Sequence, residues 1–190
     1  DAICGVDTLH IAGRHNLENA SAAISAARCI MPEVTNLQIQ EGLGSFDGLP
    51  HRLKFVAEKQ GVKFYDDSIA TTPGSAIAAL RSFDGGKVII LGGSDKGASY
   101  GEVVAVAKQE GARVVAIGQT GHAIYDLCLL MGVTVVREEG LMEDVVDRAT
   151  ELANRGDVIM LSPASASFDQ YTGYNDRGEK FIEAVNRLKD

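Results

Sequence analysis

The sequence of 190 residues contains little cysteine, and its three cysteines, Cys4, Cys29 and Cys128, are far apart. No two of them have the C-x-x-C spacing of a zinc or redox site, and an odd, scattered set does not make a disulfide framework. We therefore expect all three to be small buried side chains of a protein from a reducing compartment.

Clusters of positive charge are also missing. The chain has 18 Lys and Arg against 26 Asp and Glu, a formal net charge of -8, and no basic run, which argues against nucleic acid as a partner. No apolar run is long enough to cross a bilayer, and the N-terminus lacks the basic then apolar pattern of a signal peptide. These absences predict a soluble, cytoplasmic protein with no nucleic-acid or membrane partner.

Several catalytic fingerprints are absent as well. Neither G-x-x-x-x-G-K-[ST] nor G-x-G-x-x-G occurs, so the chain has no sequence signal for a P-loop or a dinucleotide-binding turn. It has no G-x-S-x-G elbow of a serine hydrolase. The histidines lack metal-ligand spacing, and we expect ordinary polar packing for them and assign no metal ligand; they are His10, His15, His51 and His122.

Short apolar runs, mostly β-branched, are plentiful in the second half of the chain. They lack polar alternation, as strands buried on both faces of a parallel sheet do. Helical patterns separate them and follow the last of them. This alternation predicts an α/β fold, a Rossmann-like, doubly wound and mostly parallel sheet that binds ligands beyond the carboxyl ends of its strands. The predicted strands are 87–91, 114–117, 133–136 and 158–161, and the predicted helices are about 100–109, 122–131, 141–154 and 181–188.

The first fifty residues have a different pattern. Residues 16–30 are rich in alanine with apolar residues on a helical period, which predicts a buried, closely packed helix. Pro32 ends it, and Thr35 is the expected N-cap of a short second helix. So few elements cannot form a domain by themselves. We therefore expect residues 1–48 to be the end of a larger domain.

The second domain is expected to span residues 49–190, after a stretch that is punctuated by glycine and proline. It should open with a hairpin, because residues 53–58 and 62–65 have strand composition and flank Gln-Gly.

The stretch 64–75 runs from that hairpin through two adjacent carboxylates into a helix start. Thr72 is the expected N-cap, with Pro73 at the first helical position. Such a corner can hold a phosphate through backbone N–H groups and the helix dipole, while Asp66 or Asp67 holds a metal ion or a ribose. The alternative is a solvated, well-capped turn.

Two loops at other strand ends carry ligand-binding chemistry and should lie beside that corner. Residues 92–97 read G-G-S-D-K-G, where the glycines let a ligand approach and Lys96 offers a cation for a carboxylate or phosphate. Residues 162–171 place three serines directly after a buried strand. A nucleophilic serine would need a histidine partner that the sequence does not identify, so we favour hydrogen bonding to a polar ligand.

Taken in order, these segments resemble the C-terminal part of the Mur ligases, in the branch that adds D-glutamate. The resemblance covers essentially the whole chain. Ile69 stands where the family has lysine, and Ser165 where it has cysteine. The matching segments are 13–20, similar to G-x-H-N-x-x-N-A, 49–52 (L-P-H-R), similar to the interdomain junction, 67–71, similar to D-S-K-A-T, and 161–171, similar to L-S-P-A-C-A-S-x-D-Q-F.

The resemblance implies that the intact protein is an ATP-dependent ligase. It would join D-glutamate to UDP-N-acetylmuramoyl-L-alanine in cytoplasmic peptidoglycan precursor synthesis, through an acyl phosphate and with Mg²⁺. Residues 1–48 would close its central ATPase domain, and residues 49–190 would form its amino-acid-binding domain. The chain alone is expected to be inactive, because the P-loop and magnesium-site residues are absent from it, and the protein is expected to be a monomer.

The resemblance also implies two sets of contacts, with no catalytic residue and no metal ligand assigned in this chain. The expected nucleotide contacts are Asn16, Asn19, Arg52 and Asp67. The expected D-glutamate contacts are Thr71, Lys96, Ser167, Phe168 and Tyr174. Two alternatives remain at this stage, a stand-alone module that binds a nucleotide or a small acid, and a sister ligase such as a folylpolyglutamate synthase.

Overall fold

The computed structural model describes residues 3–11, 13 and 15–190, and the side chain of residue 15 is outside that description. The segment 13–20 therefore lies partly outside the described residues, because Arg14 is not among them. The chain divides into two compact units, Asp1–Pro50 and His51–Asp190.

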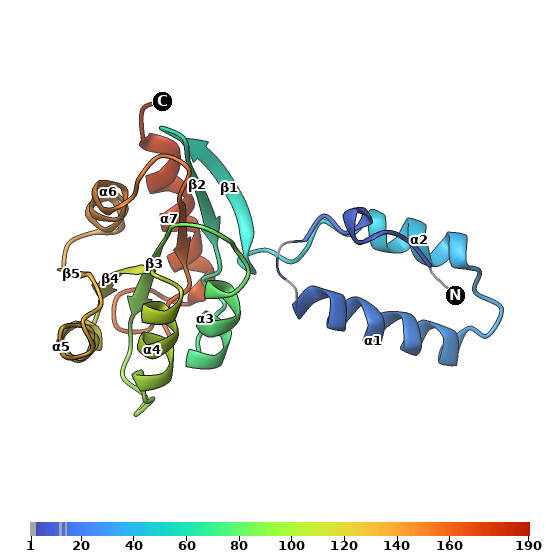
Figure 1. Cartoon of the computed structure of the whole chain (residues 1–190), viewed down its shortest axis with the longest axis horizontal. Helices are drawn as coiled ribbons and strands as arrows, with labels where there is room; N and C mark the ends of the chain where they lie inside the picture. Colours follow the sequence, from blue (N-terminus) through green and yellow to red (C-terminus); the bar gives the residue numbers. More distant parts are fainter. Residues whose placement is uncertain (1–2, 12, 14) are drawn as a thin grey trace. The chain divides into compact units, whose positions relative to one another are not determined.

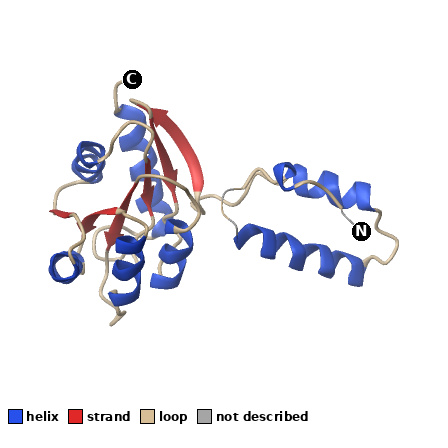
Figure 2. Cartoon of the chain, in the orientation of Figure 1, coloured by secondary structure: helices blue, strands red, loops and turns tan. Residues whose placement is uncertain are grey.

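The first unit is helical in its described part (Figure 2). The predicted N-cap of α2 is confirmed, because the Thr35 side chain accepts a hydrogen bond from the Gln38 backbone N–H, and the Gln38 side chain accepts one from the Thr35 backbone N–H. This reciprocal capping box satisfies two N–H groups that have no partner inside the helix. The elements are η1 (Val6–Thr8), α1 (His15–Ile30) and α2 (Asn36–Gly44).

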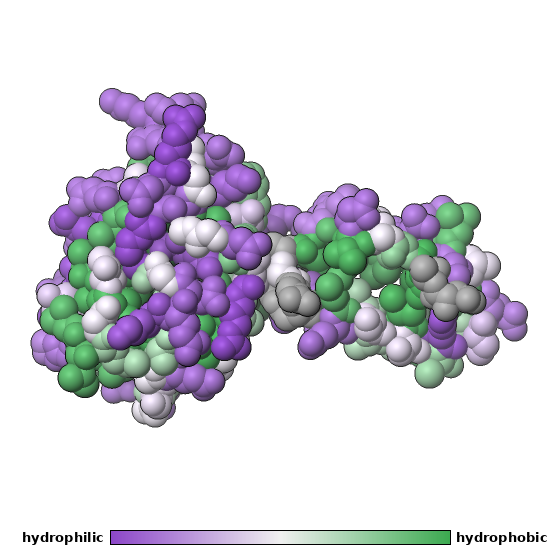
Figure 3. Space-filling view, in the orientation of Figure 1, coloured by the Kyte–Doolittle hydropathy of each residue, from purple (hydrophilic) through white to green (hydrophobic). Residues whose placement is uncertain are grey.

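The prediction that residues 16–30 form a buried helix is right about the helix and wrong about the burial. None of these residues is buried, and apolar side chains of this unit lie at the surface (Figure 3). Ile30 is 79% exposed and Leu37 is 63% exposed. Two helices and one short turn cannot cover each other's apolar faces. Cys29 is exposed and Cys4 half-buried, so of the cysteines only Cys128 matches the expected burial.

The second unit contains a six-stranded sheet in the order β1-β2-β6-β3-β4-β5 (Figure 1). The hairpin β1-β2 is antiparallel, and every other neighbouring pair is parallel. The predicted hairpin and the mostly parallel sheet are thus confirmed. The strands are β1 (Lys54–Lys59), β2 (Val62–Asp66), β3 (Lys87–Gly92), β4 (Arg113–Ile117), β5 (Val135–Glu138) and β6 (Val158–Leu161).

Helices cover both faces of this sheet, as the doubly wound prediction requires. α3, α4 and α5 pack on one face, and α6 and α7 on the other (Figure 1). No helix in the described part of the chain combines the length and apolarity needed to span a membrane. The helices are α3 (Pro73–Leu80), α4 (Gly101–Gln109), α5 (Gly121–Met131), α6 (Met142–Leu152) and α7 (Tyr174–Arg187).

The core of the second unit is built on its central strands, and β3 and β6 are buried along their whole length. One predicted strand, 133–136, is wrong in both place and burial. β5 spans Val135–Glu138, and its residues are half-buried or exposed. It is one of the two edge strands, so it has a neighbour on one side only.

Candidate functional site

The loops that follow β2, β6 and β3 begin at one edge of the sheet, because these three strands are parallel neighbours. Backbone hydrogen bonds join them: Asp67 N–H donates to Leu161 O at 2.9 Å, and Ser94 N–H donates to Ala166 O at 2.8 Å. The expectation that the three motifs lie together is therefore confirmed. Their polar side chains all belong to the second unit.

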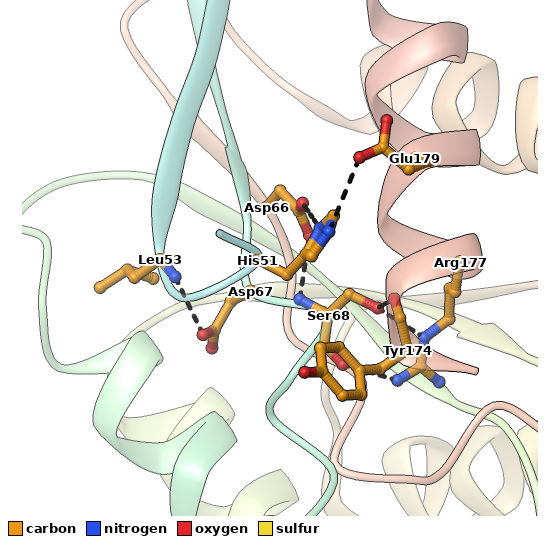
Figure 4. A network of polar contacts seen from close by, with 8 residues as sticks. All are labelled: His51, Leu53, Asp66, Asp67, Ser68, Tyr174, Arg177 and Glu179. Atoms are coloured by element: carbon orange, nitrogen blue, oxygen red, sulfur yellow. Dashed lines mark hydrogen bonds and ion pairs between the residues drawn. The ribbon is translucent and has the colours of Figure 1, made fainter. Parts of the chain in front are cut away.

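Asp66, at the end of β2, is fully buried, and both of its oxygens are engaged within the chain (Figure 4). Oδ2 lies 2.6 Å from Nδ1 of His51, and Oδ1 accepts the Ser68 N–H at 3.0 Å. Burial raises the pKa of Asp66, against the hydrogen bond from His51, which lowers it. His51 and Ser68 thus engage both oxygens of Asp66, which leaves the interpretation of Asp66 as a metal or ribose ligand without support.

Arg177 of α7 continues this network and is 1% exposed. Its Nε donates to Ser68 Oγ at 2.9 Å and its Nη2 to Ser68 O at 2.8 Å (Figure 4). Its Nη1 donates to Ala166 O at 3.3 Å. Burial lowers the pKa of Arg177 to about 10, while Tyr171, then Asp169, act in the opposite direction. One guanidinium thus holds together the loop after β2 and the loop after β6.

Asp67 is buried at the same strand end but is chemically different from its neighbour. Its Oδ2 accepts the Ser162 hydroxyl at 2.7 Å, and its Oδ1 accepts the Leu53 N–H at 3.0 Å. Burial is the largest influence on the pKa of Asp67 and raises it from 3.8 to about 6. The two hydrogen bonds and the charge of Arg52 lower the pKa by less than burial raises it. A carboxylate has about four lone-pair sites. Two sites on Asp67 are used within the chain, so ribose hydroxyls could still donate to it.

The expected D-glutamate contacts are mostly exposed side chains. Lys96, in the loop after β3, places Nζ 5.3 Å from the ring centroid of Phe168, in the loop after β6. The ring face is electron-rich and attracts the cation. Phe168 is 67% exposed and Tyr174 38% exposed, and Thr71 is exposed too.

Ser167 is the exception among those five residues. It is 2% exposed, and its hydroxyl is the one buried side-chain N or O atom of the described residues without a hydrogen-bond partner. A buried hydroxyl with no partner is costly and calls for an explanation. The other two serines of the loop have partners, since Ser162 binds Asp67 and Ser165 lies 2.7 Å from Tyr100 Oη. In the described part of the chain no histidine is hydrogen-bonded to any of these three serines, so the structure does not support a nucleophilic serine in this loop.

A second layer of contacts, which sequence reasoning did not identify, holds the loop after β3. Gly93 N–H donates to Thr120 Oγ1 at 3.1 Å, and the Thr120 N–H returns a bond to Gly93 O at 3.0 Å. Asp169 accepts the Ser94 hydroxyl at 3.2 Å and the Gln119 N–H at 2.9 Å. The base of the Lys96 loop is therefore fixed, while the lysine side chain is exposed.

The expected nucleotide contacts lie in different units. Asn19 Nδ2 donates to Asn16 Oδ1 at 2.9 Å on α1, whereas Arg52 and Asp67 belong to the second unit. Arg52 is exposed. Residues 3–11, 13 and 15–190 contain no group of three or more His, Cys, Asp and Glu side chains arranged to hold a metal ion.

Sequence reasoning missed His51 and Arg177 as parts of this site. A signal for Arg177 was present, because it precedes Phe181 and Val185 at four-residue spacing and so lies on the buried stripe of α7. A charge on an apolar stripe indicates a buried partner. For His51 the two adjacent carboxylates after β2 were the available hint.

Comparisons with known proteins agree with the geometry. The family model described as "Mur ligase, glutamate ligase domain" matches residues 51–165. The chain is 40% identical over 189 residues to the UDP-N-acetylmuramoylalanine--D-glutamate ligase of Enterococcus hirae. The alignment covers 99% of this chain and 40% of that protein. The UDP-N-acetylmuramoylalanine--D-glutamate ligase of Geobacillus kaustophilus is 40% identical over 190 residues, and the alignment covers 100% of this chain and 42% of that protein. The chain thus spans about two fifths of the length of these relatives.

Solved structures support the same fold. UDP-N-acetylmuramate-alanine ligase MurC from Thermotoga maritima has a TM-score of 0.66 at 18% identity, covering 94% of this chain and 39% of that one. Folylpolyglutamate synthase from Mycobacterium tuberculosis has a TM-score of 0.66 at 16% identity, covering 91% and 41%. Identities this low establish the fold alone, whereas the family model matches more than half of the chain. This chain belongs to the Mur ligase family and contains its glutamate ligase domain.

Proposed function

We propose that the chain is the C-terminal part of an ATP-dependent ligase that joins D-glutamate to UDP-N-acetylmuramoyl-L-alanine. Two relatives at 40% identity carry the name UDP-N-acetylmuramoylalanine--D-glutamate ligase. Within this proposal, residues 1–48 end the central ATPase domain and residues 49–190 form the amino-acid-binding domain. The intact enzyme would act as a monomer in the cytoplasm.

The observation that carries the substrate assignment is the buried Ser167 hydroxyl without a partner, beside the loop that holds Lys96. A dicarboxylate needs a cation and hydrogen-bond donors, and Lys96, Thr71 and Ser167 offer them. Phe168 and Tyr174 would contact the carbon chain. The bound substrate would supply the partner that Ser167 lacks in the free protein.

The reaction would proceed in two steps. The carboxylate of the UDP-sugar takes the γ-phosphoryl group of ATP, which releases ADP and forms an acyl phosphate. The amine of D-glutamate then attacks the acyl carbon, phosphate leaves, and the amine loses a proton to solvent. Arg52 and Asp67 of this chain, with Asn16 and Asn19, would contact the nucleotide. Mg²⁺, when bound, would offset charge on the transferred phosphoryl group, and no residue of this chain is assigned to it.

The test is a phosphate-release assay on the intact gene product. With ATP and UDP-N-acetylmuramoyl-L-alanine present, D-glutamate should support turnover, and L-lysine and meso-diaminopimelate should not. The 190-residue chain, assayed in parallel, should release no phosphate. Equal rates with L-lysine would refute the substrate assignment, and turnover by the chain alone would refute its assignment as part of a larger enzyme.

A further inference from the structure

We propose that the buried pair His51–Asp66 is a positioning device for Arg52. Together with the bond from Leu53 to Asp67, it holds the backbone of residues 51–53, here named the arch, in one conformation that presents the Arg52 guanidinium to the nucleotide. The inference rests on the proposed function, since Arg52 is there a nucleotide contact. It assigns His51 and Asp66 a role without any contact to substrate.

The arch has an unusual backbone. His51 has φ of 58° and Leu53 has φ of 46°, both in the left-handed region that residues with a Cβ rarely adopt. Each is 7% exposed, whereas Arg52 between them is exposed. Strained residues persist only where the surroundings hold them, and they cluster where geometry matters for function. The strain here lies on both sides of the one side chain that faces solvent.

Each strained residue is bound to a different carboxylate at the end of β2. His51 Nδ1 lies 2.6 Å from Asp66 Oδ2, and Leu53 N–H donates to Asp67 Oδ1 at 3.0 Å. His51 O also accepts the Ile69 N–H at 3.1 Å. Because β2 pairs with strands on both sides, the bond to Asp66 fixes the arch to the sheet, and Asp67 and Ile69 add bonds from the residues that follow β2.

Helix α7 closes the pair from the other side (Figure 4). A Cβ at Gly178 would collide with Nδ1 of His51 and lie 2.9 Å from Asp66 Oδ2, so α7 approaches this closely only because residue 178 is glycine. The Tyr174 ring stands edge-on to the imidazole at 6.1 Å, and Glu179 Oε1 is 3.7 Å from Nε2. Residues of α7 thus enclose the imidazole.

The experiment is a double-mutant cycle on the intact enzyme, with wild type, Arg52→Ala, Asp66→Asn and the double variant. We expect Arg52→Ala to raise the KM for ATP about 30-fold, as loss of a charge-assisted contact does. Asp66→Asn should raise it about tenfold, with kcat and the KM for D-glutamate within about twofold of wild type, and the double variant should be no worse than Arg52→Ala alone. If Asp66→Asn instead caused a general loss of structure, its effect on the KM for ATP would multiply with that of Arg52→Ala in the double variant. In that case kcat and the KM for D-glutamate would change as well.

The control is Asp126→Asn, which removes an exposed His–Asp pair, His122–Asp126, on α5 and should leave every constant unchanged. If Asp66→Asn does not fold, His51→Gly takes its place in the cycle, because glycine adopts the left-handed conformation freely and has no side chain that could bond Asp66. An unchanged KM for ATP in either folded variant, or effects that multiply in the double variant, overturns the proposal.

Failure of the proposed function gives a different result, since wild type itself would then not ligate D-glutamate. In that case ATP affinity of the same variants, measured by calorimetry, replaces KM in the cycle. Non-additive losses of affinity support the positioning role, and no loss in Asp66→Asn overturns it.

Discussion

Two groups of side chains at the same sheet edge differ in how they are bound. The buried network, which consists of His51, Asp66, Ser68 and Arg177, satisfies its polar groups internally. The rim, which consists of Thr71, Lys96, Phe168 and Tyr174, is exposed. A charged side chain at this edge can therefore be either a buried part of the fold, as Arg177 is, or exposed to solvent, as Lys96 is. The network should determine stability, and the rim should determine affinity.

The largest effect should come from the network. Arg177→Met removes three hydrogen bonds and leaves the buried carbonyls of Ser68 and Ala166 without this donor, so we expect a loss of about 3 kcal/mol or more in the free energy of unfolding. Urea denaturation of the chain measures it. Arg187→Met is the matched control on the same helix, where the side chain is 63% exposed. If Arg177→Met lowered the free energy of unfolding by less than about 1 kcal/mol, the network would not determine stability.

Asp67 lies between the two groups and should give the chain a pH-dependent stability. Its folded pKa of about 6 is above the ordinary value of 3.8, so between these values the folded state binds more protons than the unfolded state. Stability from this residue is therefore highest below pH 4 and is lost as pH rises to about 6, by about 2–3 kcal/mol. Urea denaturation of wild type and Asp67→Asn, measured from pH 4 to 7, gives the difference in their free energies of unfolding and so the contribution of Asp67. A pH-independent difference would show that the pKa of Asp67 is ordinary.

Removal of Lys96, the cation of the rim, should weaken substrate binding and leave stability unchanged. In the intact enzyme we expect Lys96→Ala to raise the KM for D-glutamate at least about tenfold, because a charge-assisted contact with a carboxylate is lost. The free energy of unfolding should change by less than about 0.5 kcal/mol, since the side chain is exposed. Lys108→Ala, an exposed lysine on α4, is the control. If the KM for D-glutamate did not change, Lys96 would not belong to the substrate site.

The smallest effect should come from Ser167, which is buried like the network and unpaired like a ligand-binding group. Ser167→Ala should leave the stability of the free chain unchanged or raise it by up to about 1 kcal/mol, because the hydroxyl has no partner to lose. The KM for D-glutamate should rise about fivefold, as for one hydrogen bond. Thermal denaturation and steady-state kinetics measure the two quantities. A clear loss of stability would mean that the hydroxyl has a partner in the free protein.

Local patterns predicted much of the fold. The buried strands at 87–91, 114–117 and 158–161 were readable because parallel strands need apolar side chains on both faces. The α3 start was readable because Thr72 and Pro73 satisfy fixed local requirements of a helix N-terminus. The prediction for β5 was displaced by two residues, because this edge strand has a polar second half, Arg137 and Glu138, and so a weaker apolar signal.

The buried network could not be predicted in the same way. Asp66 and His51 are 15 residues apart, and Arg177 and Ser68 are 109 apart, so their contacts depend on the strand order and on where α7 packs. Local periodicity contains neither quantity. The left-handed conformation of Leu53 is disfavoured for that residue type, and only the bonds around it explain it. The assigned substrate contacts remain predictions from the family resemblance.

The position of β6 has a consequence for how the protein folds during synthesis. β6 is the last strand in the chain, yet it lies between β2 and β3 in the sheet. Until Leu161 has left the ribosome, β2 and β3 have no strand to join them, and the loops that follow them cannot meet. Nascent chains that stall before this point should hold two separate half-sheets with open edges, a state that is prone to aggregation.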